Sequence, residues 1–269
     1  MESASSITDV IGRFPFRMAF AGGWIDQPFI SQHNPAAPGS MVVVAIEPTN
    51  PFMARSGMGT STRRMAAELW GNNVPDRDPL DLVQELYEAE NQGKAEPSGS
   101  QDMIGMLYPG VNRLDFDYAY RGGLYPVHIE SNNEADVASW LEGVIYMVPV
   151  APRPPGYTPL DEKNLDPVWI QRLGETGQVC YDSIVNKDIE GLGESMNECM
   201  KCWEAILPHT VRHPTIQIDL MGLVAYYQDH YEGAMFSGCG GGYIYVVSNQ
   251  AVPGGFQVKV RHGEARNAA

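Results

Sequence analysis

The sequence predicts an α+β fold, and three observations lead to this prediction. Of the 269 residues, 43% are hydrophobic and 19% are charged, which is typical of a globular protein with a large core. Apolar, β-branched runs such as 41–46 indicate strands, and apolar residues spaced three and four apart indicate helices. These elements follow one another in the order typical of α+β proteins, with no internal repeat and no low-complexity tract.

The N-terminal half predicts short strands that are joined to helices by glycine turns. Segment 13–20 predicts a strand that runs into the glycine turn 21–28, and 41–48 predicts a second strand. A helix is expected at 78–92, because Asp78 is a suitable N-cap and Pro79 suits the first helical position. The remaining expected elements are a glycine loop opening into a helix at 55–70, a helix at 101–108, and strands at 113–118 and 125–131.

The C-terminal half predicts a second group of elements. A strand at 143–150 precedes a proline-rich loop at 151–159, and three helices follow between Asp166 and Tyr231. The chain ends with a glycine turn and strand at 237–248 and the segment 255–262. Because "RGG" and "SNNEAD" interrupt the pattern, we expect two domains, residues 1–125 and residues 126–269.

Charge and composition limit the classes of partner. The formal net charge is −15 and the isoelectric point is near 4.7, so nucleic acid and anionic membrane are not expected to attract the chain. The longest apolar run, 41–46, is too short to span a bilayer. We therefore expect a cytoplasmic protein with a small-molecule partner, and a homodimer is left open.

The four cysteines are expected to be reduced, and Cys199 and Cys202 fit a helix face better than a metal or redox site.

The glycine loop at 57–62 is a candidate phosphate site. Glycines let the backbone approach an anion, hydroxyls donate hydrogen bonds, and the free amides at the start of the following helix point outward. The segment is neither a Walker A loop nor a G-x-G-x-x-G fingerprint. Taken alone, it is more simply read as a flexible turn before an N-capped helix.

Two carboxylates are candidates for the chemistry. Glu90 shares a helix face with Val83 and Leu86, and a carboxylate on an apolar face is usually paired or bound to a metal, although Glu90 could equally reach water at the edge of that face. Asp102 follows "SGSQ", where Ser100 or Asp102 could simply cap the next helix. Both interpretations stay open for each residue.

Four motifs in order resemble the GHMP kinases, the family of galactokinase, homoserine kinase, mevalonate kinase and phosphomevalonate kinase. They are "RFPFRMAFAGGWIDQP", "SGMGTST", "YEAENQ" with "SGSQDMIGMLYPGVNRLDF", and "GAMFSGCGGGYIYVV". The stretch "GGWIDQP" is most similar to sugar kinases that act on L-fucose and on heptose phosphates. The resemblance covers most of the chain, and it implies a two-domain fold with a ribosomal-protein-S5-like N-terminal domain and a ferredoxin-like C-terminal domain.

The resemblance also implies roles for individual residues. ATP would be held at its triphosphate by Gly57, Gly59, Thr60, Ser61 and Thr62, and Mg²⁺ by Ser61 and Glu90. Asp102 would take or orient the proton of the attacking hydroxyl, and Arg17 would steady the transferred phosphoryl group. The substrate would be contacted by Gly22, Gly23, Trp24, Asp26, Asp102, Gly238 and Gly240.

The chain departs from the family in the segment before the phosphate loop. Only 31 positions separate Asp26 from Gly57, so the N-terminal half is shortened in the part that normally helps to enclose adenine. Arg55, Arg63 and Arg64 could offset the lost base contacts by holding phosphates, or could lie on a solvated helix face. The resemblance implies an ATP- and Mg²⁺-dependent kinase for a hydroxyl of a sugar or sugar phosphate, of the heptose-7-phosphate or fucose type. The alternative is a catalytically silent relative that binds sugar or nucleotide as a sensor or structural subunit.

Overall fold

The first of two antiparallel sheets is built from the N-terminal half of the chain. The computed structural model describes residues 14–53, 55–94 and 96–263. The sheet has the strand order β1-β2-β3-β4 and contains β1 (Phe16–Ala19), β2 (Gly39–Ile46), β3 (Val111–Phe116) and β4 (His128–Asn132). In register, Arg17 lies opposite Ala45, and Leu114 lies opposite both Met41 and Ile129.

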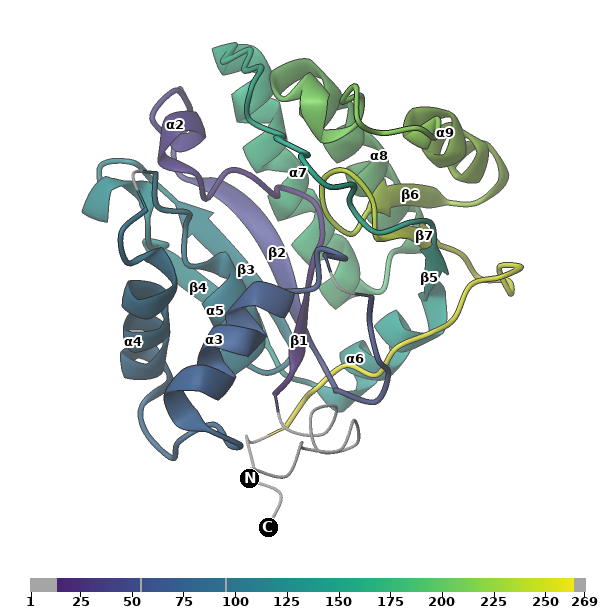
Figure 1. Cartoon of the computed structure of the whole chain (residues 1–269). Coiled ribbons are helices and arrows are strands. Elements are labelled where there is room, and N and C mark those ends of the chain that lie inside the picture. Colours follow the sequence, from purple (N-terminus) through teal and green to yellow (C-terminus); the bar gives the residue numbers. More distant parts are fainter. Residues whose placement is uncertain (1–13, 54, 95, 264–269) are drawn as a thin grey trace.

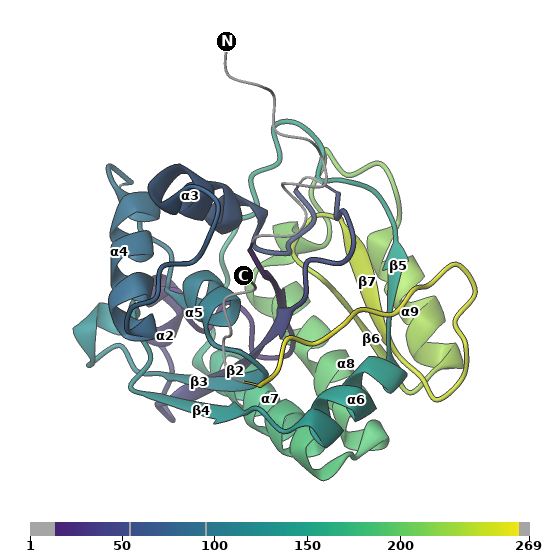
Figure 2. The same ribbon diagram turned by 90° about the horizontal axis from the view of Figure 1, so that it is seen from below.

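The central strand β2 is covered on both faces, which explains its unbroken apolar sequence. All eight of its residues are buried. Figure 2 shows α5 (Gln101–Leu107) on one side of the first sheet and α7 (Pro167–Asn186) on the other. A strand buried on both sides needs apolar residues at consecutive positions rather than alternating ones.

Two more helices extend the layer beside α5. They are α3 (Thr60–Trp70) and α4 (Pro79–Asn91), which lie together on the side of the first sheet away from α7 (Figure 1). As predicted, Asp78 caps α4: its side chain accepts a hydrogen bond of 2.8 Å from the backbone N–H of Leu80. Short helical turns at α2 (Pro28–Ser31) and η1 (Arg121–Gly123) connect the strands.

The second sheet comes from the C-terminal half. Its strand order is β5-β7-β6, with β5 (Ile145–Pro149), β6 (Gly233–Phe236) and β7 (Tyr243–Val247). Helices α8 (Ile189–Ile206) and α9 (Leu220–His230) pack on this sheet (Figure 1). The short η2 (Pro208–Thr210) follows α8 in the chain. With two antiparallel sheets and their helices, the α+β prediction is confirmed.

Helix α7 belongs to the C-terminal half but packs on β2 of the first sheet. It approaches so closely that a Cβ on Gly177 would lie 2.0 Å from the carbonyl oxygen of Ser40. One cluster of buried residues therefore runs through both halves of the chain. The division at residue 125 stays a prediction, and because β4 pairs with β3, the first sheet continues past that position.

Helix α6 (Ala135–Val144) was not expected from the sequence, and no secondary structure was predicted for segment 255–262. Helix α6 forms where "SNNEAD" indicated only an interruption, because Val137, Leu141 and Val144 supply a buried stripe. Segment 255–262 makes isolated bridges, in which Phe256 pairs with Met147 and Val260 pairs with Ile46. Segment 255–262 thus links the second sheet to the first.

Within the described ranges, no helix combines the length and the apolar character needed to cross a membrane.

The contact between α7 and β2 gives a testable prediction. Replacing Gly177 by Ala should lower the free energy of unfolding by about 1–3 kcal/mol, because the added methyl group must displace the β2 backbone. Gly143 in α6 is the matched control, since no atom lies within 4 Å of a Cβ built there, and Gly143→Ala should leave stability unchanged or raised. Urea unfolding of the two variants provides the measurement. Equal urea midpoints for the two variants would show that α7 does not lie this close to β2.

Candidate functional site

Two adjoining pockets lie where β1, the start of α3, the start of α5 and the loop after β5 meet. The larger has a volume of about 310 Å³ and the smaller about 240 Å³. Both pockets are lined by Arg17, Gly57, Asp102 and Arg153. The shared residues make the two pockets parts of one site.

The smaller pocket is built on the N-terminus of α3. Helix α3 begins after Gly59, which has a left-handed φ of 69°, and no described side chain caps the helix start. The first backbone N–H groups of a helix have no partner within it and carry partial positive charge. The buried Thr60 hydroxyl also lacks a hydrogen-bond partner in the part of the chain that the structure describes. This end of α3 therefore presents several unsatisfied donors that suit an anion.

Glycines allow the loop before α3 to touch the glycine turn before β7. Gly57 has a φ of 78°, and a Cβ there would lie 2.8 Å from Cα of Gly238. The Ser237 hydroxyl donates a hydrogen bond to the carbonyl of Ser56 beside this contact. The turn at 237–242 therefore closes directly on the glycine loop at 57–62, which we call the phosphate-type loop. Larger residues at 57 or 238 would separate the two segments.

Four arginines make the smaller pocket strongly positive. They come from β1, the loop before α3, α3 itself and the loop after β5: Arg17, Arg55, Arg64 and Arg153. This concentration stands out in a chain whose formal net charge is −15. Arg63 does not line this pocket, because its guanidinium lies 3.5 Å from the centre of the Phe16 ring and its Nε donates to the Phe14 carbonyl. The expectation that Arg63 holds phosphates is therefore not supported, whereas Arg55 and Arg64 are suitably placed.

An ion pair between Arg17 and Asp102 joins the two pockets. The Arg17 side chain is 7% exposed and the Asp102 side chain 24%, and a guanidinium N–H of Arg17 donates to Asp102 Oδ1. A second guanidinium nitrogen donates to the Gly57 carbonyl at 3.1 Å. Burial lowers the pKa of Arg17 to about 10, with Tyr245 and Asp26 opposing the effect, so the guanidinium stays charged at neutral pH.

The larger pocket combines aromatic and polar walls. Trp24 and Trp203 both line it, with their rings at 78° and centroids 6.4 Å apart. The indole N–H of Trp203 donates to the Gly23 carbonyl at 3.0 Å, which fixes the glycine turn after β1. Trp24 has a φ of 84°, a strained conformation of the kind that is found at functional sites. Gln27 and Gln101 add polar groups to the same wall.

Asp26 is a buried carboxyl group in the larger pocket with a perturbed pKa. It is 2% exposed, and burial raises its pKa to about 6, while the positive charge of Arg17 partly opposes this. Its Oδ2 accepts a hydrogen bond of 3.2 Å from the Gln27 amide. A buried carboxyl group that titrates near neutrality and lines a pocket is a candidate for substrate contact.

Glu90, which is predicted to hold Mg²⁺ together with Ser61, is hydrogen-bonded to Thr62. The Thr62 hydroxyl donates to Glu90 Oε2 at 2.6 Å, and Thr62 is fully buried. Ser61 is exposed and lines the smaller pocket instead. Carboxylate and hydroxyl oxygens are the ligands that Mg²⁺ prefers, so Glu90, Thr62 and Ser61 are chemically suited to such an ion, but Glu90 and Thr62 lie outside both pockets.

Most of the predicted site residues come together. The pockets are lined by Arg17, Gly23, Trp24, Asp26, Gly57, Gly59, Thr60, Ser61, Asp102 and Gly238. Four predicted residues do not line them: Gly22 and Gly240, which pack against Ser40 and Tyr157, and Thr62 and Glu90, which pair with each other. The sequence analysis missed Arg153 and Trp203. Arg153 was detectable as the only Lys or Arg between positions 121 and 163, at the centre of the proline-rich loop.

No protein-family model matches this sequence, and no curated protein matches it either. Solved structures do match the fold. A D-glycero-D-manno-heptose 1-phosphate kinase from Bacteroides thetaiotaomicron has a TM-score of 0.58 at 13% identity, covering 93% of this chain and 96% of that chain.

Two further solved structures match over a similar length. The mevalonate kinase of L. major in complex with R-mevalonate has a TM-score of 0.57 at 11% identity, covering 94% of this chain and 96% of that one. The galactokinase of Lactococcus lactis complexed with galactose has a TM-score of 0.56 at 12% identity, covering 93% of this chain and 94% of that one. This chain therefore has the fold of the GHMP kinases.

Proposed function

We propose that this protein transfers a phosphoryl group from a nucleoside triphosphate to a hydroxyl of a sugar or sugar phosphate. The observation that carries the proposal is the position of Asp102, which lines both pockets and is paired with Arg17 between them. A donor in one pocket and an acceptor in the other would meet at this carboxylate. The fold, which resembles that of several small-molecule kinases, supports the same reaction class.

The smaller pocket fits the triphosphate of ATP better than its base. Its described lining consists of four arginines, two glycines, Thr60, Ser61 and Asp102, with no aromatic or aliphatic side chain. Arginines and helix amides bind phosphates but do not select a purine. ATP would supply the phosphoryl group, and Mg²⁺, held by Glu90 with Thr62 or Ser61, would neutralise charge on the phosphate oxygens.

The larger pocket fits a polar, hydroxylated acceptor. Trp24 and Trp203 offer apolar faces, and Asp26, Gln27 and Gln101 offer groups that can hydrogen-bond to hydroxyls. Lys94 also lines this pocket and would suit the phosphate of a heptose 7-phosphate, while a free sugar of the fucose type would not need it. The acceptor class is therefore a sugar or a sugar phosphate.

In the reaction, Asp102 would orient the attacking hydroxyl and receive its proton, and Arg17 would neutralise charge on the transferred phosphoryl group. Burial of this ion pair strengthens the electrostatic interaction with the reacting oxygens, because little water is present to screen it. The second candidate is a protein that binds sugar or nucleotide without turnover. The absence of a base-binding wall from the described lining of the smaller pocket favours that candidate.

The kinase proposal predicts that Asp102→Asn lowers kcat by about 10²- to 10⁴-fold, the usual value of a general base. The acceptor affinity should change little, because the amide keeps the shape of the side chain. A coupled assay of ADP release over a panel of free sugars and sugar 7-phosphates provides the measurement. Asp229→Asn in α9, outside both pockets, is the control and should retain wild-type turnover. Turnover in Asp102→Asn within twofold of wild type would refute the role of Asp102, and no turnover with any acceptor would favour the silent protein.

Recognition through phosphates predicts poor selection between nucleotides. The affinities for ATP and GTP should agree within about tenfold, or ~1.4 kcal/mol, and both should fall with added salt. Arg55→Ala and Arg64→Ala should each weaken binding, whereas Arg212→Ala, which removes an exposed partner of Glu204, should not. Calorimetry with Mg²⁺ present provides the measurement. A strong preference for ATP would show that a base site exists elsewhere on the chain.

The raised pKa of Asp26 predicts a pH-dependent penalty on stability. Its pKa is about 6 in the folded protein and 3.8 as the reference value, so the folded state binds the proton more tightly. The penalty is fully present above pH 6, decreases as the pH falls from about 6 to about 4, and is absent below. Asp26→Asn should therefore raise the free energy of unfolding at pH 8 by up to about 2–3 kcal/mol, with no gain at pH 4. Urea unfolding at both values tests this; an equal gain at both would show that Asp26 is not perturbed.

A further inference from the structure

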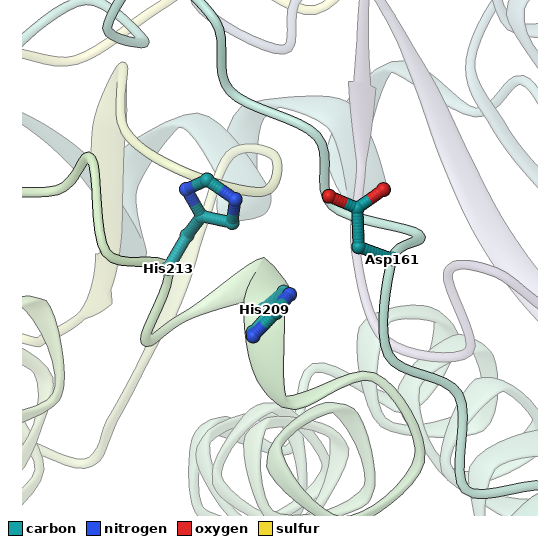
Figure 3. A group of neighbouring side chains, drawn as sticks. All are labelled: Asp161, His209 and His213. Atoms are coloured by element: carbon teal, nitrogen blue, oxygen red, sulfur yellow. The ribbon is translucent and has the colours of Figure 1, made fainter.

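A cluster of metal-binding side chains lies beside the proposed active site, in a position that the kinase chemistry does not use. Asp161 comes from the 151–166 loop after β5, and His209 and His213 come from η2 and the turn after it. One potential ligand atom from each of the three residues lies within 4.8 Å of the other two. Figure 3 shows the three side chains facing one another across the gap between these two segments.

The ring nitrogens of the two histidines have different partners. Nε2 of His209 lies 3.3 Å from Glu162 Oε2, whereas its Nδ1 is buried and has no partner among the described residues. Nδ1 of His213 lies 2.7 Å from the Thr215 hydroxyl and accepts the backbone N–H of Thr215 at 3.2 Å, so the neutral ring carries its proton on Nε2. Zinc at Nε2 would replace that proton and require the other tautomer, in which Nδ1–H donates to the Thr215 hydroxyl. Histidines that bind metals are typically oriented in this way, by a hydrogen bond from the other ring nitrogen to a carboxylate or another acceptor.

The carboxylate is also held in place. The Thr158 hydroxyl donates to Asp161 Oδ2 and lies 3.2 Å from His213 Nε2. The Thr158 hydroxyl thus bridges the carboxylate and the histidine, and it would have to give way to an ion that contacts both. His213 is buried, His209 is half-buried and Asp161 is exposed, so an ion could enter from the solvent side.

The donor set selects the class of metal. Two imidazole nitrogens and one carboxylate oxygen suit Zn²⁺, which binds nitrogen and oxygen at about 2.0–2.2 Å in tetrahedral geometry. Ligand atoms at those bond lengths lie roughly 3.3 Å apart, so the side chains must draw together from their present spacing of up to 4.8 Å. The exposed Asp161 side chain is the one of the three with most room to move, and Glu162 or water can complete the coordination.

The cluster lies where two walls of the active site are joined. Tyr157, four residues before Asp161, donates its hydroxyl to the Thr210 carbonyl, and the Gly240 amide donates to the same carbonyl at 2.8 Å. Arg153 and Leu160 of the same loop line the larger pocket. Holding Asp161 to His209 and His213 would therefore fix both the loop that carries Arg153 and the glycine turn before β7.

We infer that Asp161, His209 and His213 form a structural site for one zinc ion, which anchors the 151–166 loop to the segment after α8. The site is separate from the proposed Mg²⁺ ligands at Glu90 and Thr62. Its function does not depend on the acceptor or on the nucleotide, so it can be tested by binding and stability alone.

The test uses the full chain, purified without a histidine tag and stripped with a chelator. Zinc chloride is titrated by calorimetry, and the bound metal is counted after dialysis. We expect one zinc per chain in the wild type, and at least tenfold weaker binding in His213→Gln and Asp161→Asn. His230→Gln is the matched control, because this histidine is exposed on α9 and contacts only Tyr226 among its described partners. The control should bind zinc as the wild type does.

Hydrogen exchange provides a second measurement that reports on the loop. Zinc should slow amide exchange in residues 155–163 of the wild type and of His230→Gln, and should have no effect there in Asp161→Asn. Asp161 lies on an exposed loop, so Asp161→Asn keeps the test valid if His213→Gln does not fold. A wild type that binds no zinc at one equivalent, or variants that bind it as tightly as the wild type, would overturn the inference.

Discussion

The site depends on the buried ion pair between Arg17 and Asp102. Arg17 points out of β1 and reaches Asp102 at the start of α5 only because Gly105 leaves room for it; a Cβ on Gly105 would lie 2.2 Å from Cγ of Arg17. A buried charge is tolerated when it is paired and hydrogen-bonded, and Arg17 satisfies this through Asp102 and the Gly57 carbonyl. One guanidinium therefore fixes the relative positions of β1, α5 and the phosphate-type loop.

This acidic chain still presents a positive pocket, because arginines gather around the ion pair. Long-range attraction of anions is weak at a net charge of −15, so the positive potential has to be generated locally. The structure gathers four arginines from separate segments around the first amides of α3. Arg17 is buried whereas Arg55 and Arg64 are exposed, so screening by water is weakest at Arg17. Local geometry, rather than net charge, decides what such a pocket can bind.

The sequence was sufficient to predict the features that depend on residues close together in the chain. The Asp78 cap, the apolar run of β2 and the glycine loop before α3 each follow from residue preferences within a few positions, and they formed as expected. Other features of the candidate site depend on tertiary contacts. Arg153 reaches the pocket because a loop folds back from the second sheet, and Glu90 pairs with Thr62 because α3 packs on α4, neither of which can be read from spacing alone.

The shortened segment before the phosphate-type loop has its own anchor, in the C-terminal half. Phe52 packs edge-on against Phe16 and Tyr243, with ring centroids 4.5 and 5.8 Å apart, and the backbone N–H of Met53 donates to the Tyr243 hydroxyl at 3.1 Å. Tyr243 begins β7, directly after the glycine turn that touches Gly57. The loop that we propose binds the triphosphate is therefore held by β7 and by the glycine turn before it. Its shape depends on the C-terminal half as much as on the helix it precedes.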